Sequence, residues 1–189
     1  MRVFVGIKIT SSIMEKLKEV LSFLQEYRNQ IRTVRPENLH ITLKFLGNIT
    51  HNMYSQFSEN LQNSITEFSP FEVAIEGIGF FPSKNRARII WVGIKKNNPL
   101  ENLYKIVENS AEKINILPDN KKFHGHITVG RIKTDIDPNL INAIEEKFKE
   151  RNWENMRVEN ITIFESILHP DGPKYKELKT MTLGGTENG

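Results

Sequence analysis

Two short segments of the chain repeat one pattern, a histidine followed two residues later by a threonine. They are Leu39–Leu43 (LHITL) and Gly125–Val129 (GHITV). Because residues i and i+2 of a β-strand point to the same face, each segment would send one imidazole and one hydroxyl to the same side. In the first segment we expect Leu39, Ile41, Leu43 and Phe45 to face the core, and His40, Thr42 and Lys44 to face the opposite side.

Two imidazoles and two hydroxyls suit chemistry on a phosphodiester. A neutral imidazole can take the proton of an attacking water, while a protonated imidazole donates a proton to the leaving oxygen. The reference pKa of histidine, about 6.5, makes both states accessible near neutral pH. Threonine hydroxyls can donate to the non-bridging oxygens and hold the phosphorus in line. The candidate catalytic residues are therefore His40 and His126, and the candidate substrate-binding residues are Thr42 and Thr128.

Other interpretations of these residues remain open. A single His-Ile-Thr tripeptide is more often structural, but two copies in a chain of five histidines favour a function. His124 and His126 could form a metal-binding pair, although no acidic residue lies close in the sequence and cysteine is absent. Strict alternation places Arg131 on the face opposite His126, unless a bulge at Gly130 turns the guanidinium back towards the phosphate.

The elements that must position these residues alternate between strand and helix patterns. A capping box at Ser12–Glu15 is expected to start the first helix. Apolar spacing predicts helices over residues 13–24, 53–68, 100–114 and 140–148, and strands over 3–9, 39–45, 71–75, 88–94 and 126–132. The segments 156–168 and 175–183 are expected to form a hairpin around residues 170–173.

This succession predicts an α+β fold made of two antiparallel sheets, each with helices on its outer face. If the two halves pack face to face, the two histidines and two threonines converge on one polar cleft. Residues 1–183 are then expected to form a single bilobal catalytic domain, and residues 184–189 a flexible tail.

The composition bounds the kind of protein. The net charge of +3 permits an anionic partner but is too small to indicate nucleic acid by itself. Without cysteine, disulfides, thiolate metal sites and a cysteine nucleophile are excluded. No apolar run approaches the roughly 18 residues of a membrane span, and no signal peptide pattern is present. We therefore expect a soluble cytoplasmic protein without a membrane partner.

The chain resembles the two-histidine phosphoesterases, and within them the RNA 2′,3′-cyclic phosphodiesterases, also called 2′-5′ RNA ligases, of bacteria and archaea. The resemblance spans nearly the whole chain. Its most specific part is the run Arg35–His40 (RPENLH), and it includes Phe123–Arg131 and Gly172–Tyr175. A histidine followed by a threonine at i+2 would indicate only the superfamily.

The resemblance implies a bilobal fold with pseudo-twofold symmetry and a central cleft. It implies hydrolysis of RNA 2′,3′-cyclic phosphate ends to 2′-phosphate ends, with reversible 2′-5′ joining of RNA. In that family pattern His40 is the general acid, His126 is the general base, and Arg131 contacts the phosphate. One residue departs from the pattern, because Gly125 stands where the family usually has proline. We expect this glycine to hold His126 less tightly.

Three functions from different classes follow. The first is a phosphodiesterase that acts on RNA ends, and the second acts on a small cyclic nucleotide or a 2′-5′ oligonucleotide. The third is a non-catalytic RNA-binding protein, which the two intact motifs disfavour. For the enzyme we expect a monomer without metal or other cofactor, whose partners are RNA ends or nucleotide 2′,3′-cyclic phosphates. The chain has no ATP-binding loop, so any ligation would not be driven by ATP.

Overall fold

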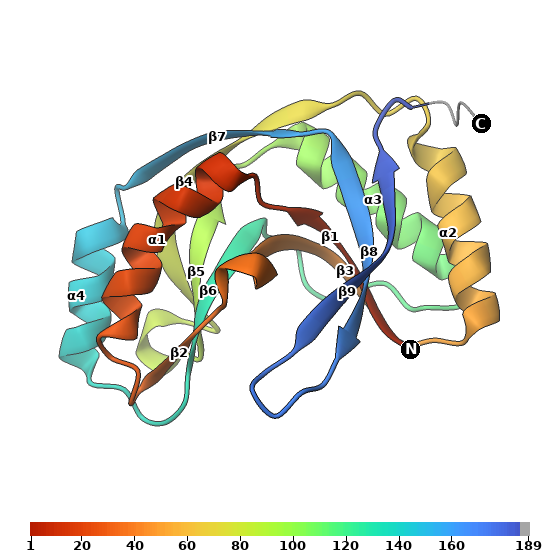
Figure 1. The fold of residues 1–189 in the computed structure, drawn as a ribbon. Coiled ribbons are helices and arrows are strands. Elements are labelled where there is room, and N and C mark those ends of the chain that lie inside the picture. The colour runs from red at the N-terminus through yellow and green to blue at the C-terminus, as the bar shows by residue number, and fades with distance from the viewer. Residues whose placement is uncertain (186–189) are drawn as a thin grey trace.

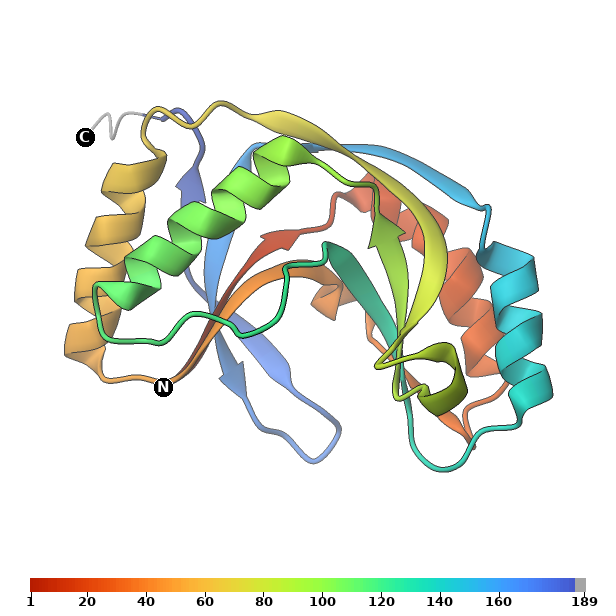
Figure 2. The ribbon, with the colours of Figure 1, turned by 180° about the vertical axis from the view of Figure 1, so that it is seen from behind.

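The structure, a computed structural model, describes residues 1–185, and these residues form four α-helices and nine β-strands (Figures 1 and 2). The helices are α1 (Ser11–Gln25), α2 (His51–Ile65), α3 (Asn98–Glu112) and α4 (Pro138–Phe148). The strands are β1 (Arg2–Lys8), β2 (Ile31–Thr33), β3 (His40–Asn48), β4 (Phe71–Phe81), β5 (Ile89–Ile94), β6 (His126–Ile132), β7 (Asn152–Val158), β8 (Asn160–Ile167) and β9 (Lys174–Thr182).

The strands pair antiparallel throughout the described residues, in the order β7-β4-β5-β6-β3-β1-β8-β9, with β2 added alongside β6. Two groups of strands meet where β3 lies beside β6, and their register there consists of the single pair Ile41 and Ile127. The α+β class and the antiparallel pairing are thus confirmed. The two predicted sheets are joined through one pair of residues into a continuous, strongly bent sheet.

Helices cover the outer side of each group of strands. In Figures 1 and 2, α1 and α4 lie together outside the β4-β5-β6 group, and α2 and α3 lie outside the β1-β3-β8 group. Helix α1 therefore covers strands from later in the chain, whereas α3 packs on β3 from earlier in the chain. The two halves of the sequence exchange helices, so neither half builds one lobe alone.

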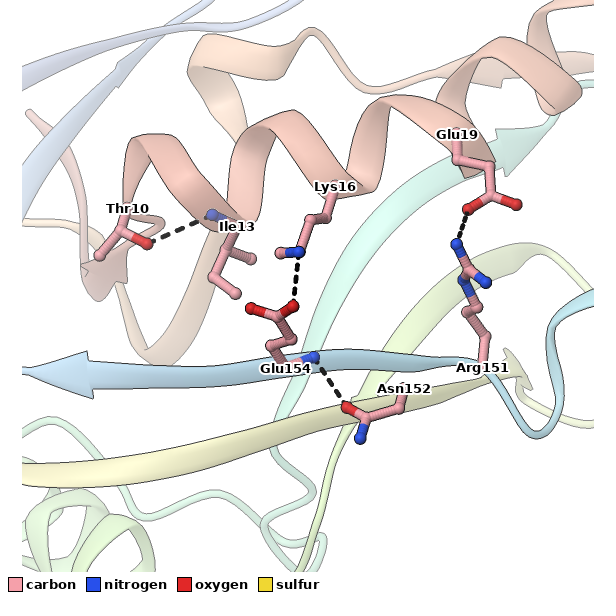
Figure 3. Close-up of polar contacts among 7 residues, drawn as sticks. All are labelled: Thr10, Ile13, Lys16, Glu19, Arg151, Asn152 and Glu154. Atoms are coloured by element: carbon pink, nitrogen blue, oxygen red, sulfur yellow. Dashed lines mark hydrogen bonds and ion pairs between the residues drawn. The ribbon is translucent and has the colours of Figure 1, made fainter.

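Ion pairs connect α1 to β7 and the residue before it, far apart in the sequence (Figure 3). Lys16 contacts Glu154 at 2.6 Å and Arg151 contacts Glu19 at 2.5 Å. All four side chains are substantially exposed, so each pair is expected to contribute at most about 1 kcal/mol. The attachment of α1 thus depends mainly on its apolar face, which buries Ile13, Leu17, Val20, Leu21 and Leu24.

The structure corrects the predicted C-terminal hairpin. The segment 156–168 is two strands, because the chain leaves β4 after β7 and joins β1 and β9 as β8. Buried positions alternate through Met156 and Val158, then resume out of phase at Ile161. The polar residues Glu159 and Asn160 mark this crossing. The hairpin itself consists of β8 and β9.

Smaller features also differ from the sequence predictions. Helix α1 begins one residue before the predicted capping box, because the Thr10 hydroxyl accepts from the Ile13 amide at 3.4 Å. Strand β2 was not predicted. Of the predicted tail, Gly184 donates its amide to the Ile65 carbonyl at 3.3 Å, whereas residues 186–189 lie outside the described part. None of the helices in residues 1–185 has the length and apolar character needed to cross a membrane.

Candidate active site

One cavity of about 980 Å³ lies over the junction of β3 and β6. Its walls also include the β8–β9 turn and the segment between α3 and β6. The five residues predicted from the sequence all border this cavity: His40, Thr42, His126, Thr128 and Arg131. The structure therefore brings together two motifs that lie in different halves of the chain.

The register at the junction determines how the two motifs face each other. Ile41 is paired with Ile127, and each is the central residue of a His-Ile-Thr segment. Because the strands are antiparallel, this pairing brings His40 towards the side of Thr128, and His126 towards the side of Thr42. The two halves are thus related by a pseudo-twofold axis at the isoleucine pair.

Each histidine is held by the same backbone contact. Nδ1 of His40 lies 2.6 Å from the Asn38 carbonyl oxygen, and Nδ1 of His126 lies 2.7 Å from the His124 carbonyl oxygen. A carbonyl oxygen can only accept, so Nδ1 carries the hydrogen in both rings. Nε2 of each ring is consequently left to accept a proton or, in the charged form, to donate one.

Aromatic rings surround His40. Its ring centroid lies 4.9 Å from Phe4 and 5.3 Å from Tyr175, with Phe164 at 6.2 Å. Burial lowers the pKa of His40; the Asn38 carbonyl partly opposes this, and the charges of His126 and Arg131 lower the pKa further. In the free protein His40 therefore loses its proton at a lower pH than an unburied histidine does.

His126 has a similar environment built from other strands. Phe81 lies 4.9 Å from its ring centroid at 85°, and Trp91 lies at 6.2 Å. Burial lowers the pKa of His126, the His124 carbonyl partly opposes this, and the charge of His124 lowers the pKa further. The neighbouring Phe80 is buried, whereas Phe81 borders the cavity.

A bulge follows each motif and reverses the faces of the residues beyond it. Thr42 pairs with Gly6 and Lys44 with Val5, which leaves Leu43 as the extra residue of β3. As a result Phe45 is 61% exposed and borders the cavity, whereas Lys44 is only 2% exposed. The expectation that Phe45 faces the core is therefore wrong, whereas Lys44 borders the cavity but is buried.

The equivalent bulge in β6 explains the position of Arg131. Ile90 pairs with Gly130 and Trp91 with Thr128, so Val129 is the extra residue. Arg131 is thereby exposed on the cavity side, as the bulge hypothesis required, although the bulge lies one residue before Gly130. A Cβ at Gly130 would approach Ile31 at 3.1 Å, so this glycine is suited to close packing.

The buried Lys44 anchors the segment that forms one wall of the cavity. Its Nζ donates to the Leu117 carbonyl at 3.0 Å and to Asp119 at 2.8 Å, and it forms an ion pair with Glu108 at 2.7 Å. Burial disfavours the charge, but the bonds to Asp119 and Glu108 outweigh it and raise the pKa of Lys44. Strand alternation predicted neither this network nor its effect on residues 117–119.

Tyr175 is a cavity residue that the motif analysis did not single out for chemistry. Its ring lies edge-on to His40, and burial raises its pKa against the opposing charges of Arg131 and Arg2. The phenol therefore keeps its proton and can donate a hydrogen bond. Tyr175 enters the cavity from the start of β9, so pairing of β8 with β1 is needed to bring it beside His40.

The described residues provide no third ligand for a metal ion bound by His124 and His126. Among residues 1–185 no group of three or more histidine, aspartate or glutamate side chains is arranged to hold a metal ion. The rings of His124 and His126 are 6.2 Å apart.

Gly125, between these two histidines, is tightly enclosed. Its carbonyl accepts from the Ile94 amide at 3.1 Å, and a Cβ there would lie 3.0 Å from Leu100 and 3.2 Å from Ile94. Close packing therefore accounts for a glycine at this position.

Comparisons with known proteins agree with the internal symmetry of the site. The family model described as LigT like phosphoesterase matches the chain twice, over residues 7–91 and 92–175, and each match contains one His-Ile-Thr segment.

Curated relatives match over nearly their full length. A protein of Archaeoglobus fulgidus named RNA 2′,3′-cyclic phosphodiesterase is 36% identical over 95% of this chain and 98% of its own. A protein of the same name from Aquifex aeolicus is 33% identical over 97% of this chain and 98% of its own.

Solved structures share the fold. A protein of Thermus thermophilus superposes with a TM-score of 0.84 at 22% identity, over 98% of this chain and 99% of its own. LigT of E. coli in its apo form superposes with a TM-score of 0.78 at 22% identity, over 97% of this chain and 98% of its own.

Proposed function

Since this chain belongs to the LigT like phosphoesterase family, we propose that it hydrolyses 2′,3′-cyclic phosphate ends of RNA to 2′-phosphomonoesters. The curated relatives that match over 95% of the chain or more carry the name of that activity. The observation that carries the proposal is the matched pair of histidines, each held through Nδ1 so that Nε2 is left for proton transfer at one cavity.

In the proposed reaction His126 acts as the general base and His40 as the general acid. Nε2 of neutral His126 takes a proton from water as the water oxygen bonds to phosphorus. The bond from phosphorus to the 3′ oxygen breaks, and protonated His40 donates its Nε2 proton to that oxygen. The phosphate remains on the 2′ oxygen. Transfer of the proton from His126 to solvent and reprotonation of His40 restore the starting state.

The remaining candidate residues stabilise the charge that develops on the phosphate. Hydroxyls of Thr42 and Thr128 donate to the non-bridging oxygens from the two motifs, and Arg131 supplies a cation beside His40. Tyr175, whose raised pKa keeps it protonated, can donate a further hydrogen bond from the same side. We propose that these protein groups suffice without a metal ion or another cofactor.

A 5′ hydroxyl of a second RNA in place of water would give the 2′-5′ joining reaction with the same two histidines. We propose that residues 1–183 act as one catalytic unit, because the exchange of α1 and α3 makes each lobe depend on both halves. The proposed enzyme is a cytoplasmic monomer.

The experiment that tests this function measures turnover of an RNA ending in a 2′,3′-cyclic phosphate and identifies the position of the product phosphate. A 2′-phosphate product that depends on both histidines is the expected outcome. A 3′-phosphate product, or no turnover of any cyclic phosphate, would contradict it. Turnover of small cyclic nucleotides in preference to RNA would favour the second function over the first.

A further inference from the structure

Arginines gather at one end of the cavity, beyond the residues assigned to the reaction. Arg32 on β2 pairs directly with Arg131 on β6, and Arg131 pairs on its other side with Ile89, the neighbour of Arg88. Directly opposed residues of an antiparallel pair share a face, and Arg32, Arg88 and Arg131 all border the cavity. Arg32 and Arg131 lie on neighbouring strands about 4.8 Å apart, and Arg88, just before β5, lies on the other side of Arg131; these three residues form a row with Arg131 in the middle.

No carboxylate neutralises this row within the part of the chain that the structure describes. None of the three guanidinium groups has an ion pair or a side-chain hydrogen bond with any of residues 1–185. The two acidic residues that border the cavity are engaged elsewhere, because Asp119 binds Lys44 and Asp171 lies 3.4 Å from His169. All three arginines are exposed.

Like charges directly opposite each other on neighbouring strands destabilise a sheet. The folded chain therefore accepts a cost at Arg32 and Arg131 that an anionic ligand would relieve. Guanidinium groups bind phosphates through paired hydrogen bonds, which give both affinity and a defined geometry. A row of guanidinium groups is better suited to bind several successive phosphates than to bind a single phosphate.

The row lies on a defined side of the reaction centre. Arg131 is close enough to His40 to lower the pKa of that histidine, whereas Arg32 and Arg88 flank Arg131 on its two sides. The scissile phosphate at the motifs would thus lie beside Arg131, at the middle of the row, with Arg32 and Arg88 on either side. A 2′,3′-cyclic phosphate ends an RNA at its 3′ side, so any further phosphates belong to nucleotides on its 5′ side.

From this geometry we infer that Arg32 and Arg88 bind backbone phosphates on the 5′ side of the cyclic end, so that single-stranded RNA is preferred over a mononucleotide. The inference rests on the proposed function and specifies its substrate class. Phe45 borders the cavity from β3, and Lys121 and Lys122 follow Asp119, which binds Lys44 beside Phe45; we expect the RNA strand to leave the site away from this end.

The test compares kcat/KM for a mononucleoside 2′,3′-cyclic phosphate and for a short single-stranded RNA with the same end. Arg32→Gln and Arg88→Gln should each lower kcat/KM for the RNA by about tenfold, the loss expected for one charge-assisted bond. The mononucleotide value should stay within about twofold. For the RNA substrate, the slope of log kcat/KM against log salt concentration should also become shallower by roughly 0.7 with each substitution.

Two control variants sharpen the comparison. Arg28→Gln removes an exposed arginine that does not border the cavity, and it should leave kcat/KM for both substrates unchanged. Lys121→Gln combined with Lys122→Gln removes the cations of the opposite end, and it should affect RNA less than either arginine change. Thermal melting confirms that each variant is folded.

The outcomes separate this inference from the proposed function. If the unaltered enzyme turns over neither substrate, the proposed function fails. In another outcome the unaltered enzyme turns over both substrates, while the arginine variants lose kcat/KM equally for RNA and mononucleotide or lose none for RNA. That result would overturn the inference alone. A selective loss in the lysine variant instead would place the RNA strand at the other end of the cavity and also overturn it.

Discussion

Ile41 and Ile127 lie opposite each other at the junction of β3 and β6, and each stands between the histidine and threonine of its motif. This pairing relates the two motifs by a pseudo-twofold axis and makes Phe45 and Arg131 equivalent positions, three residues beyond each threonine. Both are exposed to the cavity after a bulge. The symmetric backbone thus presents an aromatic ring at one end and a cation at the other.

His40→Ala and His126→Ala should each lower turnover of the RNA end by about 10² to 10⁴-fold, the usual contribution of a general acid or base. Turnover by the double variant should be little lower than turnover by the less active of the two single variants, because the two groups act as a unit. Steady-state kinetics with thermal melting checks both statements. His51→Ala, which changes an exposed histidine outside the cavity, is the matched control. Near-full activity of His40→Ala or of His126→Ala would show that the active site lies elsewhere.

The pH dependence of kcat/KM should be bell-shaped, with its maximum below about pH 6.5. Burial lowers the pKa of both histidines in the free protein from that reference value, and kcat/KM reports the free enzyme. Both limbs belong to the coupled pair, so their mean is shifted to acid pH. A maximum well above pH 7, or a profile without two limbs, would contradict the mechanism.

The same profile distinguishes the two roles. Activity falls on the acid side when the base becomes protonated, so replacing His126 should flatten the acid limb. It falls on the alkaline side when the acid loses its proton, so replacing His40 should flatten the alkaline limb. The residual rates of the two alanine variants, measured from pH 4 to 9, provide the data. The opposite pattern would exchange the two assignments.

Hydrolysis should continue in excess chelator, because the proposed acid, base and phosphate ligands are all side chains of the protein. The measurement is the rate on RNA before and after treatment with EDTA, with each common divalent ion added back in turn. An unchanged rate is the expected result. Loss of activity that one specific divalent ion restores would instead favour the interpretation of His124 and His126 as metal ligands.

Lys44→Met should destabilise the fold by about 3–5 kcal/mol, because it leaves the nearly buried Glu108 without its cation. Urea unfolding measures the loss, and adding Glu108→Gln should recover much of it. Lys18→Met, which removes an exposed pair with Glu15, should cost at most about 1 kcal/mol. A loss of less than that for Lys44→Met would show that the segment around Asp119 does not depend on this anchor.

Local spacing in the chain was enough to establish the two motifs and the helices. Alternation of apolar residues through Ile41 and Ile127 placed a histidine and a threonine on one face of each strand, and both motifs border the cavity as expected. The apolar faces of the four helices were likewise visible, since a helix repeats its buried face every three or four residues. The resemblance of nearly the whole chain to one family supplied the fold and the expected chemistry.

The faces of Lys44, Phe45 and Arg131 followed instead from strand pairing, because a bulge is defined by the register of the partner strand. The crossing from β7 to β8 and the exchange of α1 and α3 also depend on packing between distant segments. The arginine row depends on the bulge that exposes Arg131 and on the pairing of distant segments. Arg32 lies on the unpredicted strand β2 and meets Arg131 only because β2 pairs with β6. Such pairings join residues far apart in the chain, so no local pattern records them.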